Sequence, residues 1–495
     1  MLYAAMIAID LYYSNIAAKR QKARELHKVC IKLLNQREQM SLVGCDRLCD
    51  LQAMFLVEVF AQYCAQRCFK TLSPRFDSML EKLLSIRGVS PAVIYNVPSP
   101  SSMPEDSIED CWVQWAKASA RQHLLLSCFI LEAQQYTLLA RDRESTLQTM
   151  SDSLPFPINE SWWGAETASE WSLIAQDQRG MPTTTCEALQ PQLRGRYDTF
   201  QSAVLIAAQY GNSNSFGFNS GMAIEGLLSN SWTIQLQLLT TKLAQLLPMR
   251  ALLAVSGETW IFGTKLTSED ECSALRSSLR TWLDQLWSCS DDSDENSAAE
   301  ALHISISILE LSLEADTRLS LGLGNELGVF FAALVLWAAT AAAHSRSCVP
   351  KIPFGPLLPP HRNTSTTSQP VDSSYTATLT TYHQSVHGLM GLEGTLCAPF
   401  HRRGSVPYQE IISNTTRFLQ NAAEDIATFN LTACDIGSTS VLLWAKIHLR
   451  GSFRNGQQPT NTSADASDQL NGEVINEAIG QIERMLDHGW EGWDI

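Results

Sequence analysis

Cysteines that recur in pairs are the first residues in this sequence whose type and spacing could do chemistry. Cys45, Cys49, Cys64 and Cys68 form two C-x3-C pairs separated by fourteen residues. In a continuous helix the pairs would lie about 22 Å apart, because each residue advances the helix by about 1.5 Å. Tetrahedral zinc needs four sulfur ligands at about 2.3 Å from one ion. We therefore interpret these cysteines as small residues on a helix and not as a zinc site.

A second set of metal-ligating residue types lies further along the chain. His383-x3-His387 is followed by Cys397-x3-His401, with a glycine-containing turn between the two pairs. These ligand types and spacings suit zinc, but they match none of the familiar zinc modules and adjoin a low-complexity segment. Surface and helix-capping histidines are the preferred interpretation, so the sequence predicts no metal site.

Carboxylates cluster in the run Asp291, Asp292, Ser293, Asp294 and Glu295. The run resembles the aspartate motif of all-α terpene synthases, in which clustered oxygens hold magnesium against a diphosphate. Such carboxylates must lie on a rigid helix that faces a cavity, whereas these lie in a Ser-rich stretch with no second metal motif downstream. We interpret the run as a solvated linker. An all-α enzyme or apolar-ligand-binding protein is retained as the alternative function.

Other catalytic signatures are missing from the sequence. It has no G-x-S-x-G motif, no phosphate-binding glycine loop, no dinucleotide fingerprint and no H-E-x-x-H. We therefore predict that the chain is not an enzyme and that it carries no catalytic, cofactor-binding or metal-binding residues.

The charge balance bears on possible partners. The chain has 495 residues, of which 18% are charged, and its formal net charge is -15. Duplex DNA is bound largely by Lys and Arg side chains that neutralise phosphates, so the acidic balance argues against nucleic-acid binding by the whole chain. The basic cluster Lys19–Arg24 is interpreted as a solvated helix face in preference to a weak nuclear-import signal. Thirteen cysteines, an odd number, indicate reduced thiols in a cytosolic or nuclear protein.

Helical periodicity dominates the apolar stretches. The sequence therefore predicts an all-α fold, a large helical bundle-like body with long Ser/Pro/Thr-rich loops. Apolar residues recur at three- and four-residue steps at Leu48, Leu51, Phe55, Val59 and Tyr63, and again at Val474, Ala478, Ile482 and Met485. Two N-cap signals, Ser107-x-x-Asp110 and Thr267-x-x-Asp270, predict helix starts.

Two segments admit a different interpretation. Residues 302–313 (LHISISILELSL) alternate like a strand but also carry a helical stripe, and no second strand lies nearby, so we predict a helix. Residues 327–343 are uncharged and close to the shortest length that spans a membrane. Their high alanine content favours a buried core helix, and a membrane anchor is a third, less favoured alternative.

Breaks in the pattern predict the domain organisation. Pro-, Ser- and Thr-rich or acidic stretches at 88–106, 288–298 and 346–380 are possible sub-boundaries within a single domain that covers 1–495. Residues 451–472 are predicted to be a disordered excursion. Four tryptophans, Trp112, Trp115, Trp162 and Trp163, would serve as apolar contact surface or as buried core, and we favour core.

An ordered series of segments resembles the fungal-specific transcription factor domain, which is also called the middle-homology or regulatory region. No single motif is specific, and the resemblance comes from the series, which runs over nearly the whole chain. Its segments are LCDLQAMFLVEVFAQYCAQRCFKTLSPRFDSML, CWVQWAKASARQHLLLSCFILEAQQ, SLPFPINESWWGAETASEW, MRALLAVSGETWIFGTKL, GVFFAALVLWAAT, HRRGSVPYQEII and MLDHGWEGW. The series is most similar to the branch in which this all-α domain follows paired two-cysteine, two-histidine zinc fingers.

The resemblance implies a regulator of RNA polymerase II genes in a fungal nucleus, with roles in metabolic or secondary-metabolite gene clusters. In that branch the DNA-reading fingers, and their zinc, precede the domain. This sequence opens inside the domain at MLYAAMIAIDLYYSN and contains no finger motif, so we expect the N-terminal DNA-binding domain to be absent. The expected partners are proteins: a second copy, a DNA-binding regulator or the transcription machinery. No direct nucleic-acid contact and no membrane contact are expected.

Overall fold

The structure is a computed structural model of the whole chain. It describes residues 1–14, 16–39, 47–66, 71–85, 105–139, 154–177, 182–189, 196–210, 224–257, 266, 268–288, 296–314, 324–348, 406–450 and 471–492. Within these ranges the chain is 84% helical, with 17 α-helices and no strand. A single isolated bridge joins Pro155 to Thr184. The predicted all-α fold is therefore confirmed.

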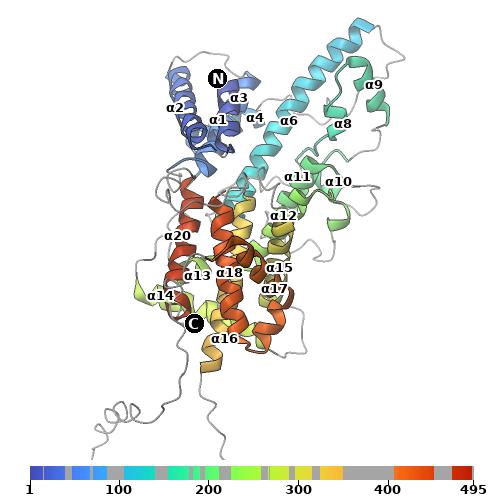
Figure 1. Cartoon of the computed structure of the whole chain (residues 1–495). Coiled ribbons are helices and arrows are strands. Elements are labelled where there is room, and N and C mark those ends of the chain that lie inside the picture. Colours follow the sequence, from blue (N-terminus) through green and yellow to red (C-terminus); the bar gives the residue numbers. More distant parts are fainter. Residues whose placement is uncertain are drawn as a thin grey trace, which may run out of the picture.

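The first part of the chain forms a small group of helices at one end of the molecule (Figure 1). These helices are α1 (Leu2–Tyr12), α2 (Ala17–Gln39), α3 (Leu48–Tyr63) and α4 (Pro74–Ser85). The predicted stripe on α3 is confirmed in part: Leu51, Val59 and Tyr63 are buried, whereas Leu48 and Phe55 are half-buried. A long helix, α6 (Glu105–Leu139), packs against α3 and α4 and runs on to the helices that follow in the sequence.

Shorter helices lie along α6 (Figure 1). They are α8 (Glu160–Trp163), α9 (Ala168–Asp177), α10 (Thr185–Ala188), α11 (Thr199–Tyr210) and the 3-10 turn η3 (Ile224–Gly226), followed by the longer α12 (Trp232–Leu246). Tryptophan rings join α6 to α8 and α9, because Trp115 lies 5.1 Å from Trp162 and 5.5 Å from Trp171 between ring centroids. All three rings are buried. The predicted core role is thus confirmed for Trp115 and Trp162.

The remaining helices form the main body and share one large apolar core with part of α12 (Figure 1). They are α13 (Met249–Val255), α14 (Glu269–Asp284), η4 (Gln285–Trp287), α15 (Ser297–Glu314), α16 (Asn325–Cys348), α17 (Tyr408–Ala427), α18 (Leu431–Arg450), α20 (Glu473–His488) and η7 (Gly489–Gly492). The predicted helix over 302–313 is confirmed as part of α15. The stripe predicted near the C-terminus is confirmed on α20, where Val474, Ala478, Ile482 and Met485 are all buried.

Helix α16 is the centre of this body. It packs against α12, α15 and α18, and every residue from 327 to 343 is buried. Among the described residues it is the single helix long and apolar enough to cross a membrane, but 94% of its most apolar window is buried inside the fold. A helix that is apolar on all sides is expected at the middle of a large core. The burial agrees with the core interpretation of residues 327–343.

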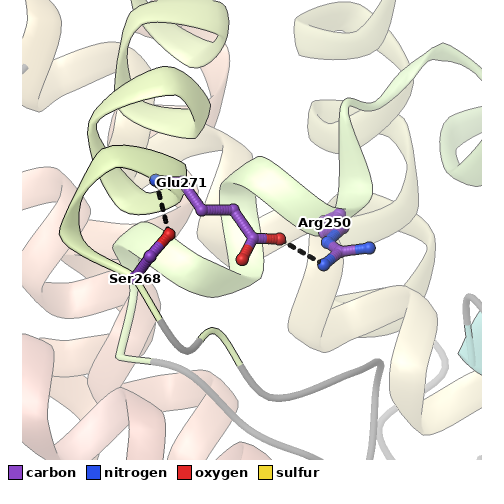
Figure 2. Close-up of polar contacts among 3 residues, drawn as sticks. All are labelled: Arg250, Ser268 and Glu271. Atoms are coloured by element: carbon purple, nitrogen blue, oxygen red, sulfur yellow. Dashed lines mark hydrogen bonds and ion pairs between the residues drawn. The ribbon is translucent and has the colours of Figure 1, made fainter.

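Both N-cap predictions were misplaced. Helix α6 begins at Glu105, so Ser107 lies within its first turn and does not precede the helix. Helix α14 is capped one residue later than predicted, by Ser268, whose Oγ accepts a 3.1 Å hydrogen bond from the Glu271 backbone N–H. Glu271 then pairs with Arg250 of α13 at 2.7 Å, which ties the two helices together (Figure 2). Several candidate caps adjoin one another at each start, and the packing of the helix selects among them.

The interpretation of Lys19–Arg24 as a solvated face was correct for its lysines and wrong for its arginines. Lys19 and Lys22 are exposed. The Arg20 guanidinium donates a 2.7 Å hydrogen bond to the side-chain oxygen of Asn471, and Arg24, which is buried, donates to the Asn471 carbonyl oxygen at 3.0 Å. These contacts join α2 to a residue that follows more than 440 positions later in the chain.

The predicted excursion over 451–472 was therefore wrong at its end. Both Asn471 and Gly472 are buried, Asn471 against α2 and Gly472 against α1 and α3. The Gly472 N–H donates a 2.7 Å hydrogen bond to the Tyr12 hydroxyl oxygen. A side chain at Gly472 would overlap the carbonyl oxygen of Tyr63, so only glycine fits this close approach.

The predicted sub-boundaries fall mostly outside the described residues. Of the segment 88–106, only the start of α6 is described, and of 288–298 only Ser288 and the start of α15. Helix α16 continues to Cys348, so the predicted break at 346–380 begins too early. The single-domain assignment remains a prediction.

Candidate functional site

The residues that the sequence singled out as possible metal ligands are not brought together where they are described. Cys49 is exposed at the start of α3 and Cys64 is buried just after its end. The described part of the chain holds no group of three or more His, Cys, Asp or Glu side chains arranged to bind a metal ion. Cys45, Cys68, His383, His387, Cys397, His401 and residues 291–295 lie outside the described residues, so those interpretations stay predictions.

A cavity of about 720 Å³ lies where α6, α8, α11 and α12 meet the first residue of α16. Its volume is within the range of about 300–1,000 Å³ that is usual for small-molecule sites. The residues that give it its character are His123, Trp163, Asp198, Phe200, Gln237 and Asn325. Each of the five helices contributes at least one of them, so this pocket is the candidate functional site.

Asp198 positions two of the helices that form the pocket. It is the residue before α11, and its Oδ1 accepts a 2.8 Å hydrogen bond from the Gln201 backbone N–H. The Gln201 side chain reaches back to the Asp198 backbone N–H at 3.2 Å, which completes a reciprocal capping box. The other carboxylate oxygen of Asp198, Oδ2, accepts a 2.7 Å hydrogen bond from the backbone N–H of Glu160, the first residue of α8. A single carboxylate therefore holds the starts of α8 and α11 side by side.

Glutamine side chains bind the segment that precedes α8 to helices α6 and α11. Gln122 of α6 donates a 2.7 Å hydrogen bond to the Phe156 carbonyl oxygen, and Gln201 of α11 donates one of 2.9 Å to that of Pro157. Both glutamines are buried. These buried amides satisfy the backbone carbonyls of Phe156 and Pro157, so α6 and α11 hold the segment that leads into α8.

Three stacked rings form the aromatic wall of the pocket. The His123 imidazole lies 4.5 Å from Trp163 and 4.9 Å from Phe200, measured between ring centroids, and its plane is 12° from that of Phe200. The Trp163 ring is tilted by 30° from the imidazole, and this tryptophan is 41% exposed. The predicted core role is wrong for Trp163, because its neighbour Trp162 takes the buried position on this short helix.

The protonation of His123 follows from its surroundings. Its Nδ1–H donates a 2.9 Å hydrogen bond to the Ser119 carbonyl oxygen one turn earlier in α6. Burial lowers the pKa of the imidazole, and the Ser119 carbonyl and the Asp198 carboxylate oppose that shift. The neutral ring with its proton on Nδ1 leaves Nε2 as an acceptor. Among the described residues, Nε2 has no hydrogen-bond partner.

Two amide side chains from the other side of the pocket add polar groups. Asn325, the first residue of α16, is only 4% exposed and lines the cavity. Gln237 of α12 is half-buried and lines it as well. Within the described part of the chain neither side chain has a hydrogen-bond partner. The amide atoms of Asn325 are not among the buried side-chain atoms that lack a partner, so they are open to solvent in the pocket.

Only weak signals of this site are present in the sequence. Asp198-x-x-Gln201 is a capping signal that can be read directly, and Asn325 precedes the apolar run of α16 as a helix start. His123 lies inside α6, and no spacing motif in the sequence marks this histidine as functional. The sequence prediction of no site residues therefore passed over this pocket.

Comparison with known proteins gives one informative match. The chain is 23% identical over 269 residues to a protein of Gibberella fujikuroi described as "Transcription factor". The matched part is 52% of this chain and 34% of that relative, so the chain spans about a third of the relative's length. No family model matches the chain, and no solved structure matches it. The chain is thus similar, at a distance, to a fungal transcription factor.

Proposed function

We propose that this chain is the regulatory body of a fungal transcription factor and that it controls RNA polymerase II genes in the nucleus. The observation that carries the proposal is the similarity to the Gibberella fujikuroi transcription factor over half of the chain. The all-α architecture supports the proposal, because it is the architecture that the resemblance implies. A regulatory body of this kind acts by binding other molecules and needs no catalytic group.

The proposal extends to the type of regulator. The ordered segments resemble the fungal-specific transcription factor domain of the branch preceded by paired two-cysteine, two-histidine zinc fingers. Any zinc would then belong to the fingers, and the target genes would belong to metabolic or secondary-metabolite clusters. Because the match takes in only 34% of the relative, the activity of that whole protein is carried over here as a proposal.

Contact with DNA is assigned to a partner or to another part of a longer protein. The formal net charge of -15 opposes the release of counterions that supplies most non-specific affinity for duplexes. Arg20 and Arg24, the arginines of the basic cluster, are already bound to Asn471. We therefore propose protein partners: a second copy, a DNA-binding regulator or the transcription machinery.

A tethering experiment tests the proposal. The chain is fused to a heterologous DNA-binding domain in a filamentous fungus with a reporter gene that carries the matching sites. We expect reporter expression to change by about tenfold in either direction, relative to the DNA-binding domain alone. The control is the same fusion with Leu173→Ala, a change of a 65% exposed side chain on α9. Equal expression from the fusion and the DNA-binding domain, at matched protein levels, would refute the proposal.

A separate measurement tests the assignment of DNA contact. The purified chain is mixed with promoter fragments at moderate salt in a gel-retardation assay, and we expect no shifted band. Salt-sensitive and sequence-selective retardation by the isolated chain would show that a base-reading surface exists on it. The exposed Lys19 and Lys22 would then be the first residues to replace.

A further inference from the structure

The pocket between α6 and α16 has a chemistry that selects among ligands. Its lining combines Trp163, which is 41% exposed, with aliphatic side chains from α6, α11 and α12. Aromatic faces bind flat rings in offset or edge-on contact. The cavity, about 720 Å³, is large enough for a molecule of two to four rings. The lining therefore suits a flat, apolar molecule.

The charged side chains of the pocket further restrict which ligands it can bind. The described residues that line the pocket include two carboxylates, Asp198 and Glu160, and no lysine or arginine. Both oxygens of Asp198 bind backbone N–H groups, so its charge is fixed in place. An anionic ligand would have to give up its hydration here without a cationic partner, and it would be repelled by the two carboxylates. Within the described lining, charge therefore favours a neutral ligand over an anion.

Polar groups in the pocket specify what the ligand must carry. His123 Nε2 accepts a hydrogen bond when the ring is neutral, a form that its half-buried position favours. The side chains of Asn325 and Gln237 can each donate and accept. Asn325 is only 4% exposed, but its amide atoms are not among the buried atoms without a partner, so they are open to the pocket and a ligand could replace water at them.

We infer that this pocket binds a neutral, flat, ring-containing small molecule that carries a hydroxyl or carbonyl group for His123, Asn325 or Gln237. The binding site itself stands independently of the proposed function. Its consequence, that occupancy by such a molecule adjusts a regulator, rests on the proposed function.

Isothermal titration of the purified full chain with two matched probes tests the inference. The probes are 2-naphthol, which is neutral near pH 7, and 2-naphthoate, which has the same rings and a negative charge. We expect saturable binding of 2-naphthol, about tenfold or more tighter than that of 2-naphthoate, since an uncompensated charge opposes binding in this lining. No binding of 2-naphthol up to about millimolar concentration, which is the weak end for ligands of this size, would overturn the inference. Equal affinity for the two probes would overturn it as well.

Three substitutions in the pocket lining test where the probe binds. Trp163→Ala, at a 41% exposed position, removes the open ring and should weaken 2-naphthol binding about tenfold. Asn325→Ala and Gln237→Ala should each weaken it by about threefold to tenfold, the effect of losing one neutral hydrogen bond. Gln237 is half-buried and is the safeguard if the Asn325 variant does not fold, which circular dichroism would reveal. Unchanged binding in both Trp163→Ala and Gln237→Ala would place the probe elsewhere and refute the site.

Two controls separate this result from the proposed function. Leu173→Ala, remote from the pocket and exposed, should bind 2-naphthol like the parent chain. The titration does not involve transcription, and the tethered reporter is measured without any probe. Binding of 2-naphthol together with unchanged reporter expression would therefore refute the proposed function and support the binding site. A change in reporter expression without binding of 2-naphthol would refute only the binding site.

Discussion

Gly437 lies at the crossing of α17 and α18, the two helices that pack together most extensively in the main body. A Cβ atom at this position would overlap the ring of Phe418 and lie 2.6 Å from the Cβ of that residue. Phe418 is only 4% exposed and belongs to the large core, so its ring has no free space to turn into. The substitution Gly437→Ala therefore forces the two helices apart or displaces a buried ring.

Two opposing effects set the size of the change. Alanine stabilises a helix interior by about 1 kcal/mol relative to glycine. Overpacking of a filled core costs about 1–3 kcal/mol, and the direct overlap with Phe418 places this case at the upper end. We expect Gly437→Ala to lower the free energy of unfolding by about 2 kcal/mol, so the packing effect outweighs the helix propensity.

Urea unfolding followed by far-ultraviolet circular dichroism measures this change, and α20 supplies a matched control. Gly480 lies inside α20, and the nearest atom to an added Cβ is the end of the flexible Arg484 side chain at 3.6 Å. The same substitution there, Gly480→Ala, should raise the free energy of unfolding by about 0.5–1 kcal/mol. The two glycine-to-alanine changes are therefore predicted to have opposite signs.

A double-mutant cycle isolates the contact itself. In a Phe418→Ala background the ring is gone but the Cβ of residue 418 remains 2.6 Å from the added Cβ, so Gly437→Ala should still destabilise, by less than it does in the parent chain. If Gly437→Ala stabilises the parent chain as much as Gly480→Ala does, α17 and α18 are not in close contact and the packing of the main body is wrong.

The remaining predictions concern a cap, a buried ring and a titration. Ser268→Ala should lower the free energy of unfolding by about 1 kcal/mol, because the first turn of α14 loses its side-chain acceptor. Arg250→Ala should lower it by less than about 1 kcal/mol, since the ion pair of Arg250 with Glu271 is exposed. A larger loss for Arg250→Ala than for Ser268→Ala in urea unfolding would contradict this order. Trp162→Ala truncates a core side chain and should lower the free energy of unfolding by about 3–5 kcal/mol. Trp163→Ala, at the 41% exposed neighbouring position, should lower it by far less. Similar unfolding midpoints for the two variants would contradict the assignment of Trp162 as buried and Trp163 as exposed. Burial lowers the pKa of His123 below its unfolded value of about 6.5, so the stability linked to its neutral form is present above that pH and is lost as the pH falls through it toward the folded pKa. A His123→Phe variant should consequently lose less stability than the parent between about pH 7.5 and pH 5.5, and an equal loss in both would show that His123 titrates normally.

Local patterns in the sequence determined much of the helical framework. The three- and four-residue spacing on α3 and α20 identified the buried faces, because each periodicity is a property of one helix and needs no knowledge of its neighbours. The same reasoning gave the correct result for the ambiguous segment inside α15. It also placed α16 in the core, since a helix that is apolar on every side can be accommodated only where other helices surround it.

Helix ends and long-range contacts were decided by the tertiary structure. The cap of α14 differs from the predicted one by a single residue, because neighbouring hydroxyl and carboxyl side chains offer similar caps and packing chooses between them. Arg20 and Arg24 had the spacing of a solvated helix face, and their contact with Asn471 depends on a segment that follows more than 440 residues later. No local pattern specifies such a partner.

The candidate pocket shows the same division. The sequence predicted helices where α6 and α16 lie, and it contains the Asp198-x-x-Gln201 capping signal at the start of α11. Only the tertiary structure brought His123, Trp163 and Asn325 around one cavity. The physical reason is that burial of apolar surface is non-directional: the pattern of a helix states which face must leave water, but not which other faces will cover it or where their packing leaves a space.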